Sequence, residues 1–212
     1  MRDAVPATLA VVASLLAAAT PLIAAPASGA SPLPTPAGAP ASSTSGTKIG
    51  TKSAGHSCAY ANLRPTAADT ALVDTATLCL IDRLRAAFRL LPLRSNRELQ
   101  AVAGEQATGM VRNDYFGDDS PTGETPARLI EALPYGAHAS SLATAQNLGW
   151  GTRSAATPAG MVVAWMHSPP HREVILTGAF REIGVGVSPA VPSILAHGQR
   201  GATYAVEFAA RG

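Results

Sequence analysis

The chain has few charged residues and only two cysteines. The first shortage argues against binding to nucleic acid or to a charged membrane surface, and the second argues against a metal site built from cysteines. Charged residues make up 14% of its 212 residues, and the formal net charge is only +2. This balance is too mild for a nucleic-acid footprint or a polybasic membrane patch, so we expect no nucleic-acid partner. Neither cysteine belongs to a Cys-x-x-Cys pair. That spacing argues against a cysteine-based metal site.

The one long apolar run lies near the N-terminus and is too short to anchor the protein in a membrane. It follows Arg2, extends from Ala7 to Ala19 and is interrupted by Pro21, whereas a spanning helix needs about 20 apolar residues. Small residues follow, as a signal peptidase prefers. Residues 1–30 are therefore predicted to be a secretory signal peptide, cleaved between Ala25 and Ala30. We expect a secreted, extracellular protein with no stable insertion in a membrane.

The next segment, residues 31–56, lacks the apolar residues that a core requires. It consists mainly of Ser, Pro, Thr, Gly and Ala, and Ile49 is its only large branched apolar residue besides Leu33. Such a composition cannot offset the entropy of ordering, so we predict a disordered linker. The remaining residues, 57–212, number about 155 and are enough for one self-sufficient domain.

Cys58 and Cys79 are the two cysteines of the chain. An exported protein meets an oxidising medium, so a single disulfide is the predicted state. Two buried free thiols are the alternative.

Helices are predicted mainly in the first half of this domain and strands in the second. Apolar residues recur at helical spacing over about 67–90, and again from the capping residues 95–98 to about Asn113, with Gln106 facing inward. Two Thr-Pro pairs start further helices, at Pro126 and at Pro158. Strands are expected near 141–148, 183–187 and 204–209. This distribution predicts an α+β domain in which helices cover an antiparallel sheet.

A longer motif points to a family. The chain reads Trp165-Met166-His167-Ser168-Pro169-Pro170-His171-Arg172 and, further on, Ile183-Gly184-Val185-Gly186-Val187; Tyr115-Phe116 and Asn147-Leu148-Gly149 precede them in the same order. This order resembles the bacterial, SCP-like branch of the CAP superfamily, named after cysteine-rich secretory, antigen 5 and pathogenesis-related proteins. The resemblance implies a three-layer α-β-α sandwich with a central antiparallel sheet and a cleft.

In that family the cleft holds two histidines and acidic partners that can bind a divalent metal such as zinc. The later histidine matches His171, whereas Asp118 stands at the position of the earlier one. Gln146 stands where the family has the glutamate of Gly-Glu-Asn. We therefore predict a ligand cleft formed by Asp118, Gln146, Ser168 and His171. His171 and Asp118 remain as ligands for a weakly bound divalent metal, and no catalytic residue is assigned.

Several interpretations of His171 stay open at this stage. It can be a structural histidine at a helix end, the partner of an aspartate without a metal, or part of a hydrolytic triad with Ser120 or Ser168. The leading hypothesis is a secreted CAP-domain protein that binds a small apolar or glycan-like ligand without catalysis. The alternative is a metal-assisted hydrolase acting on peptide or cell-wall polymer, which needs at least three protein ligands for its metal.

Overall fold

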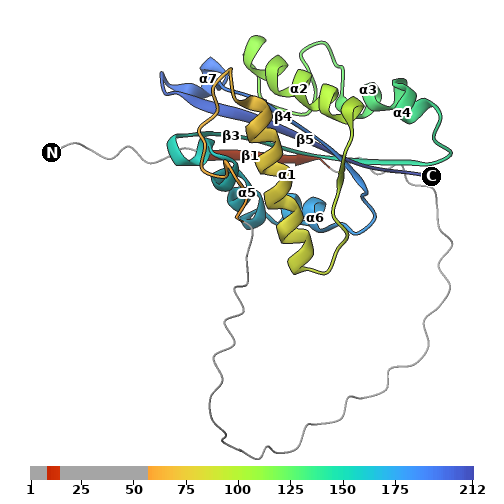
Figure 1. Cartoon of the computed structure of the whole chain (residues 1–212). Coiled ribbons are helices and arrows are strands. Elements are labelled where there is room, and N and C mark those ends of the chain that lie inside the picture. The colour runs from red at the N-terminus through yellow and green to blue at the C-terminus, as the bar shows by residue number, and fades with distance from the viewer. Residues whose placement is uncertain (1–8, 15–56) are drawn as a thin grey trace, which may run out of the picture. The chain divides into compact units, whose positions relative to one another are not determined.

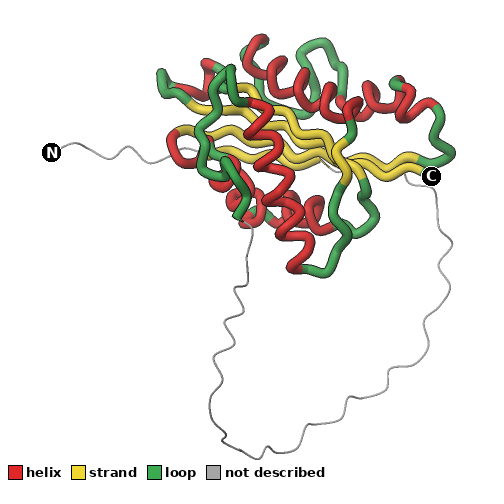
Figure 2. Tube along the Cα trace, viewed as in Figure 1, coloured by secondary structure: helices red, strands yellow, loops and turns green. Residues whose placement is uncertain are grey.

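The computed structural model describes residues 9–14 and 57–212, and these form three layers with the sheet in the middle (Figures 1 and 2). The strand order is β1-β3-β5-β4-β2. The strands are β1 (Leu9–Ser14), β2 (Arg94–Ser95), β3 (Leu142–Thr152), β4 (Glu182–Ser188) and β5 (Gly201–Arg211). The predicted α+β sandwich is confirmed. The sheet is not wholly antiparallel, because the short β2 runs parallel to β4.

Helices cover both faces of this sheet. One layer contains α1 (Thr70–Ala87), α5 (Pro158–His167) and α6 (Pro169–Leu176), and the other contains α2 (Arg97–Arg112), α3 (Pro126–Ala132) and α4 (Pro134–Ala137). A 3-10 helix, η1 (Arg153–Ala156), follows β3, and α7 (Ser193–Ala196) lies between β4 and β5. The largest core cluster joins the first layer to the sheet, with Trp165, Tyr204 and Phe208 fully buried in it.

Side-chain caps explain where three of these helices begin. The Oδ1 of Asn96 accepts hydrogen bonds from the first amides of α2, and Thr125 and Thr157 cap α3 and α5 ahead of a proline, as predicted. The predicted start of α1, at about residue 67, was three residues too early. The Thr66 amide does donate to Asp69 Oδ1, at 2.6 Å, but residues 67–69 form a turn and the helix starts at Thr70.

Two glycines of β4 let α2 lie directly on the sheet. A Cβ atom at Gly184 would stand 2.1 Å from the carbonyl carbon of Leu99, and one at Gly186 would stand 2.3 Å from that of Ala103. Both distances are far below van der Waals contact. The two glycines thus keep this strand thin for close packing, which fixes the height of α2 above the sheet.

The strands are longer than predicted because both of their faces are covered. β3 continues to Thr152, and all its residues from Ala145 onward are buried. β5 pairs with β3 over eleven residues and with β4 over seven. A strand buried on both faces loses the alternation of apolar and polar residues that marks a strand end in the sequence.

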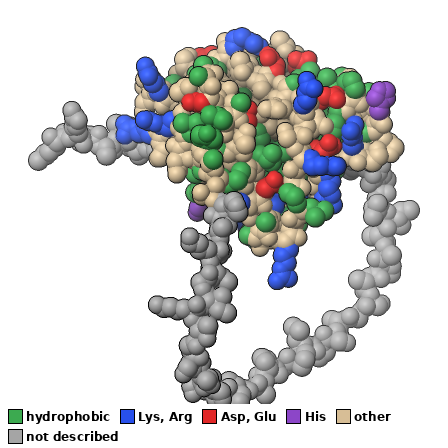
Figure 3. Space-filling view, in the orientation of Figure 1, with side chains coloured by type: hydrophobic (Ala, Val, Ile, Leu, Met, Phe, Trp, Pro, Cys, Tyr) green, Lys and Arg blue, Asp and Glu red, His purple; other side chains and the backbone are tan. Residues whose placement is uncertain are grey.

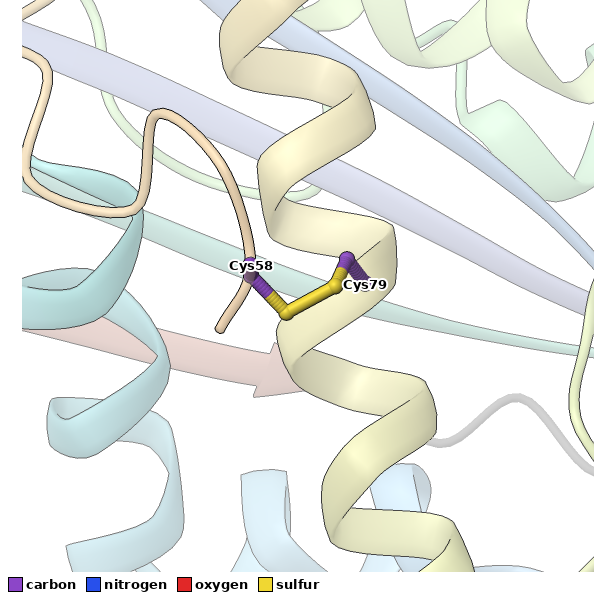
Figure 4. Close-up of a disulfide and its surroundings, with 2 residues drawn as sticks. All are labelled: Cys58 and Cys79. Carbon is purple, nitrogen blue, oxygen red and sulfur yellow. A yellow bond between two sulfur atoms is a disulfide. The ribbon is translucent and has the colours of Figure 1, made fainter. Parts of the chain in front are cut away.

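The disulfide between Cys58 and Cys79 is present, with the two Cα atoms 5.8 Å apart. Figure 4 shows it joining the segment that precedes α1 to the middle of that helix. We call residues 58–67 the arm.

Most of residues 1–30 and all of the linker 31–56 lie outside the described residues. β1 falls within the predicted signal peptide and pairs with the edge of β3, from Leu9 opposite Gly151 to Ser14 opposite Gln146. The prediction of a cleaved signal peptide stays a prediction. In the part of the chain that the structure describes, no helix is long and apolar enough to cross a membrane.

Candidate functional site

Asp118 and Gln146 line one small hollow beside the start of β3. Glu207 of β5 lines it with them, together with residues of the α3 start, and its volume is about 20 Å³. The side chain of Gln106 holds the loop that carries Asp118, because its Nε2 donates to the carbonyl oxygens of Gly117 and Asp118, at 2.9 and 3.2 Å. The inward orientation predicted for Gln106 is confirmed, since the residue is 7% exposed.

The centre of this hollow is a pair of side chains from neighbouring strands. Gln146 and Glu207 stand opposite each other in the β3–β5 register, and Gln146 Nε2 donates to Glu207 Oε1 at 2.5 Å. Both residues are buried. Burial raises the pKa of Glu207 to about 8, the Gln146 hydrogen bond opposes this, and the nearby charge of Asp118 adds to it. Glu207 is therefore mainly protonated at neutral pH and can donate a hydrogen bond itself.

His171 lies in the first turn of α6, because Pro169 and Pro170 occupy the first positions of a new helix. Its side chain is 1% exposed, and Nδ1 lies 2.7 Å from Ser168 Oγ. The carbonyl oxygen of His171 accepts from Asn147 Nδ2 at 3.1 Å.

The four predicted cleft residues thus form two pairs joined through β3. Asp118 and Gln146 share the hollow, and Ser168 and His171 share a hydrogen bond. Neighbouring residues of a strand point to opposite faces, so Gln146 and Asn147 direct their side chains to different helix layers. The backbone of His171 is consequently held on the face opposite the Gln146 amide.

The residues of this site do not fit a divalent metal centre. Within residues 9–14 and 57–212, no three His, Cys, Asp or Glu side chains lie where they could hold one ion together. The amide of Gln146 is turned to Glu207 as a donor, and a neutral amide is a poor ligand for zinc in any case.

Glu207 was missed from the sequence as a site residue. It is the one acidic residue of β5, between Val206 and Phe208, and a lone carboxyl inside an apolar strand is a signal that could have marked it. No motif that we used extends to that strand.

Comparison with known proteins gives the class of this fold. The sequence profile of the CAP, or cysteine-rich secretory protein, family matches residues 78–191, slightly more than half of the chain. The chain belongs to this family.

Two relatives illustrate the likeness. The protein is 33% identical to the uncharacterized protein YkwD of Bacillus subtilis over 97 residues, which are 46% of this chain and 35% of YkwD. It is similar to the crystal structure of an extracellular SCP-domain protein of Bacillus anthracis, with a TM-score of 0.50 at 20% identity, over 69% of this chain and 44% of the other. This second likeness shows the fold. The chain spans less than half the length of each of these two relatives.

Proposed function

We propose that this chain is an exported CAP-domain protein that binds a small glycan-like ligand, without catalysis, by admitting one hydroxyl group into the hollow at Gln146 and Glu207. The volume of about 20 Å³ supports this choice, because it holds a group the size of one water molecule. Gln146 Oε1 is a buried acceptor with no hydrogen-bond partner among the described residues, and protonated Glu207 is a donor. A hydroxyl both donates and accepts, so it satisfies both atoms. An apolar ligand would leave them unpaired.

Export is supported by the disulfide of the chain. The Cys58–Cys79 disulfide is the form that an oxidising compartment favours. Removal of the predicted signal peptide would also take away β1 and leave the backbone of β3 from Gln146 to Gly151 unpaired. This edge begins at the hollow, so the rest of the ligand has an open strand beside which to lie.

A glycan titration tests the proposal. The probe is the N-acetylglucosamine trimer, added to the secreted form that lacks the predicted signal peptide, while amide shifts are followed by NMR. Ala127→Leu is expected to weaken binding at least about tenfold, because Ala127 lines the hollow and a larger side chain closes it. Ala132→Leu, the same change at an exposed residue of the same helix, is the matched control. Unchanged binding in Ala127→Leu, or an equal loss in both variants, would refute the site.

The alternative of a metal-assisted hydrolase is tested with zinc itself. The unmodified protein should bind zinc poorly. Asp118→His supplies an imidazole, and exchanging Gln146→Glu with Glu207→Gln returns a carboxyl to β3 without setting two carboxyls 2.5 Å apart. We expect this triple variant to gain zinc affinity in titration calorimetry, and His171→Ala, on the opposite face of the sheet, to leave that gain unchanged. Tight, stoichiometric zinc in the unmodified protein would overturn the non-catalytic assignment.

A further inference from the structure

A second and much larger concavity lies where the arm meets the connection between β4 and β5. Its volume is about 850 Å³, within the range of ligand-binding pockets. It is lined by residues 63–67 of the arm, by Ala156 of η1, and by residues 189–191 and 199–201 of the connection. We call it the arm groove. None of these residues lines the hollow at Gln146 and Glu207.

Hydrogen bonds hold both walls of the arm groove in place. On one side the amide of Ala159 donates to Ala61 O at 2.8 Å, which ties the arm to α5. On the other, Thr203 Oγ1 donates to Ala190 O at 2.8 Å. Asp114 also accepts from Ser193 and Ile194 and thereby fixes α7. The groove is therefore preformed, which reduces the ordering cost of binding.

The floor of the groove is equally constrained. A Cβ atom on Gly201 would stand 2.2 Å from Gly151 O and 2.6 Å from Val191 Cγ2. The start of β5, the end of β3 and the connection therefore pack against one another at backbone distance. Only glycine fits this contact.

The charged side chains that line this surface are all basic, whereas the carboxylate of Asp69 lies against the backbone of the lining residue Thr66. Arg64 and Arg200 line the arm groove, and Arg64 also lines an adjoining concavity of about 290 Å³ together with Arg153. Among the described residues that line either concavity there is no Asp or Glu. All three arginines are exposed, and Figure 3 shows basic side chains beside an apolar patch at the left edge of the domain. Because the two concavities share Arg64, we refer to them together as the cationic channel.

The backbone is strained at two points of the same region. Arg153 has a φ of 54° and His197 a φ of 44°, both in the left-handed region that such residues rarely adopt. Strain of this kind persists where the surrounding structure imposes it, and it concentrates at ligand sites.

We propose that the arm groove and its extension past Arg64 bind an extended ligand carrying several phosphate groups, such as a polyol phosphate chain. A guanidinium presents a fork of N–H donors that matches phosphate oxygens, and three of them along one channel fit repeated phosphates better than a single anion. Apart from Gln199, the other residues that line the arm groove are small or aliphatic, among them Leu63, Pro65 and Val191, and none has an aromatic ring. Nucleobases are held by stacking on aromatic side chains, so a chain recognised through its phosphates is a better match than a nucleic acid.

The experiment uses the full chain and sodium tripolyphosphate as the probe, with binding measured by titration calorimetry. Arg64→Gln is expected to weaken binding at least about tenfold, because Arg64 borders both concavities and each lost charged hydrogen bond contributes about that factor. Arg97→Gln removes the same charge from an exposed position on α2 and should change the affinity less than about twofold.

A second pair of variants distinguishes a loss of binding caused by a blocked arm groove from a loss caused by damage to the fold. Ala67→Trp fills the arm groove from its wall, whereas Ala68→Trp places the same ring at the next exposed residue, which does not line the groove. Only Ala67→Trp should lose the probe. Equal loss in Arg97→Gln and Arg64→Gln would show mere attraction to positive charge and overturn the proposal. Inorganic phosphate binding as tightly as tripolyphosphate would exclude an extended ligand, and hexaglutamate binding as tightly would exclude selection for phosphate.

Discussion

The buried carboxyl of Glu207 makes the stability of this protein depend on pH, and Glu207→Gln should remove that dependence. In the unfolded chain the group loses its proton near pH 4.5, whereas in the fold it keeps the proton until about pH 8. Between these values the folded state binds more protons than the unfolded state, so the free energy of unfolding falls as the pH rises. At about 1.4 kcal/mol for each pH unit, the loss between pH 4.5 and pH 8 amounts to about 5 kcal/mol.

The assay is urea denaturation at half-unit steps from pH 4.5 to pH 8.5. Glutamine has nearly the shape of protonated glutamate, so the variant should match the wild type near pH 4.5 and exceed it by several kcal/mol near pH 8. Burial also raises the pKa of Asp74 to about 7, which adds a slope of the same sign. Asp74→Asn measures that share separately. Identical pH slopes in the wild type and in Glu207→Gln would refute the argument that Glu207 is protonated in the fold.

Three further predictions concern the framework of the site. Gly184→Ala should destabilise the fold by about 2 kcal/mol or more in denaturant melts, because the new methyl meets the α2 backbone, whereas Gly117→Ala, with open space around it, should cost less than half as much. Replacing Cys58 and Cys79 by serine should lower the free energy of unfolding by about 2–4 kcal/mol, and reductant should then have no further effect. His171→Ala should cost about 2 kcal/mol in thermal melts, since it empties a buried position and leaves its hydrogen-bond partner unpaired; a change below 0.5 kcal/mol would contradict the burial of this histidine.

Much of the fold follows from local chemistry that the sequence displays. The caps at Thr125 and Thr157, each before a proline, start helices where predicted, and the inward position of Gln106 follows from its place in an apolar stripe. The ends of the strands do not follow in this way. Their limits depend on cover from both helix layers, which is a property of the assembled domain. The pair Pro169-Pro170 is compatible locally both with the end of α5 and with the start of a new helix. Only the packing of the assembled domain shows that it starts α6 and that His171 lies in this helix.

The site shows a different limit of the sequence. Along the chain, Gln146 is read as the loss of a carboxyl. Across the sheet, Glu207 stands opposite it, so a carboxyl is present in the same hollow, contributed by the neighbouring strand. Residues 61 positions apart become partners only through the β3–β5 register.

The disulfide has a consequence for when the arm groove comes into being. The loop closed by Cys58 and Cys79 contains residues 63–67, which form one wall of that groove, while the opposite wall belongs to the sheet and its connection. The hydrophobic core is built almost entirely from residues outside the arm, so it can assemble while the thiols are still reduced. Oxidation then fixes the arm against α1. Reduction of this disulfide should therefore loosen that wall of the cationic channel while the hydrophobic core stays assembled.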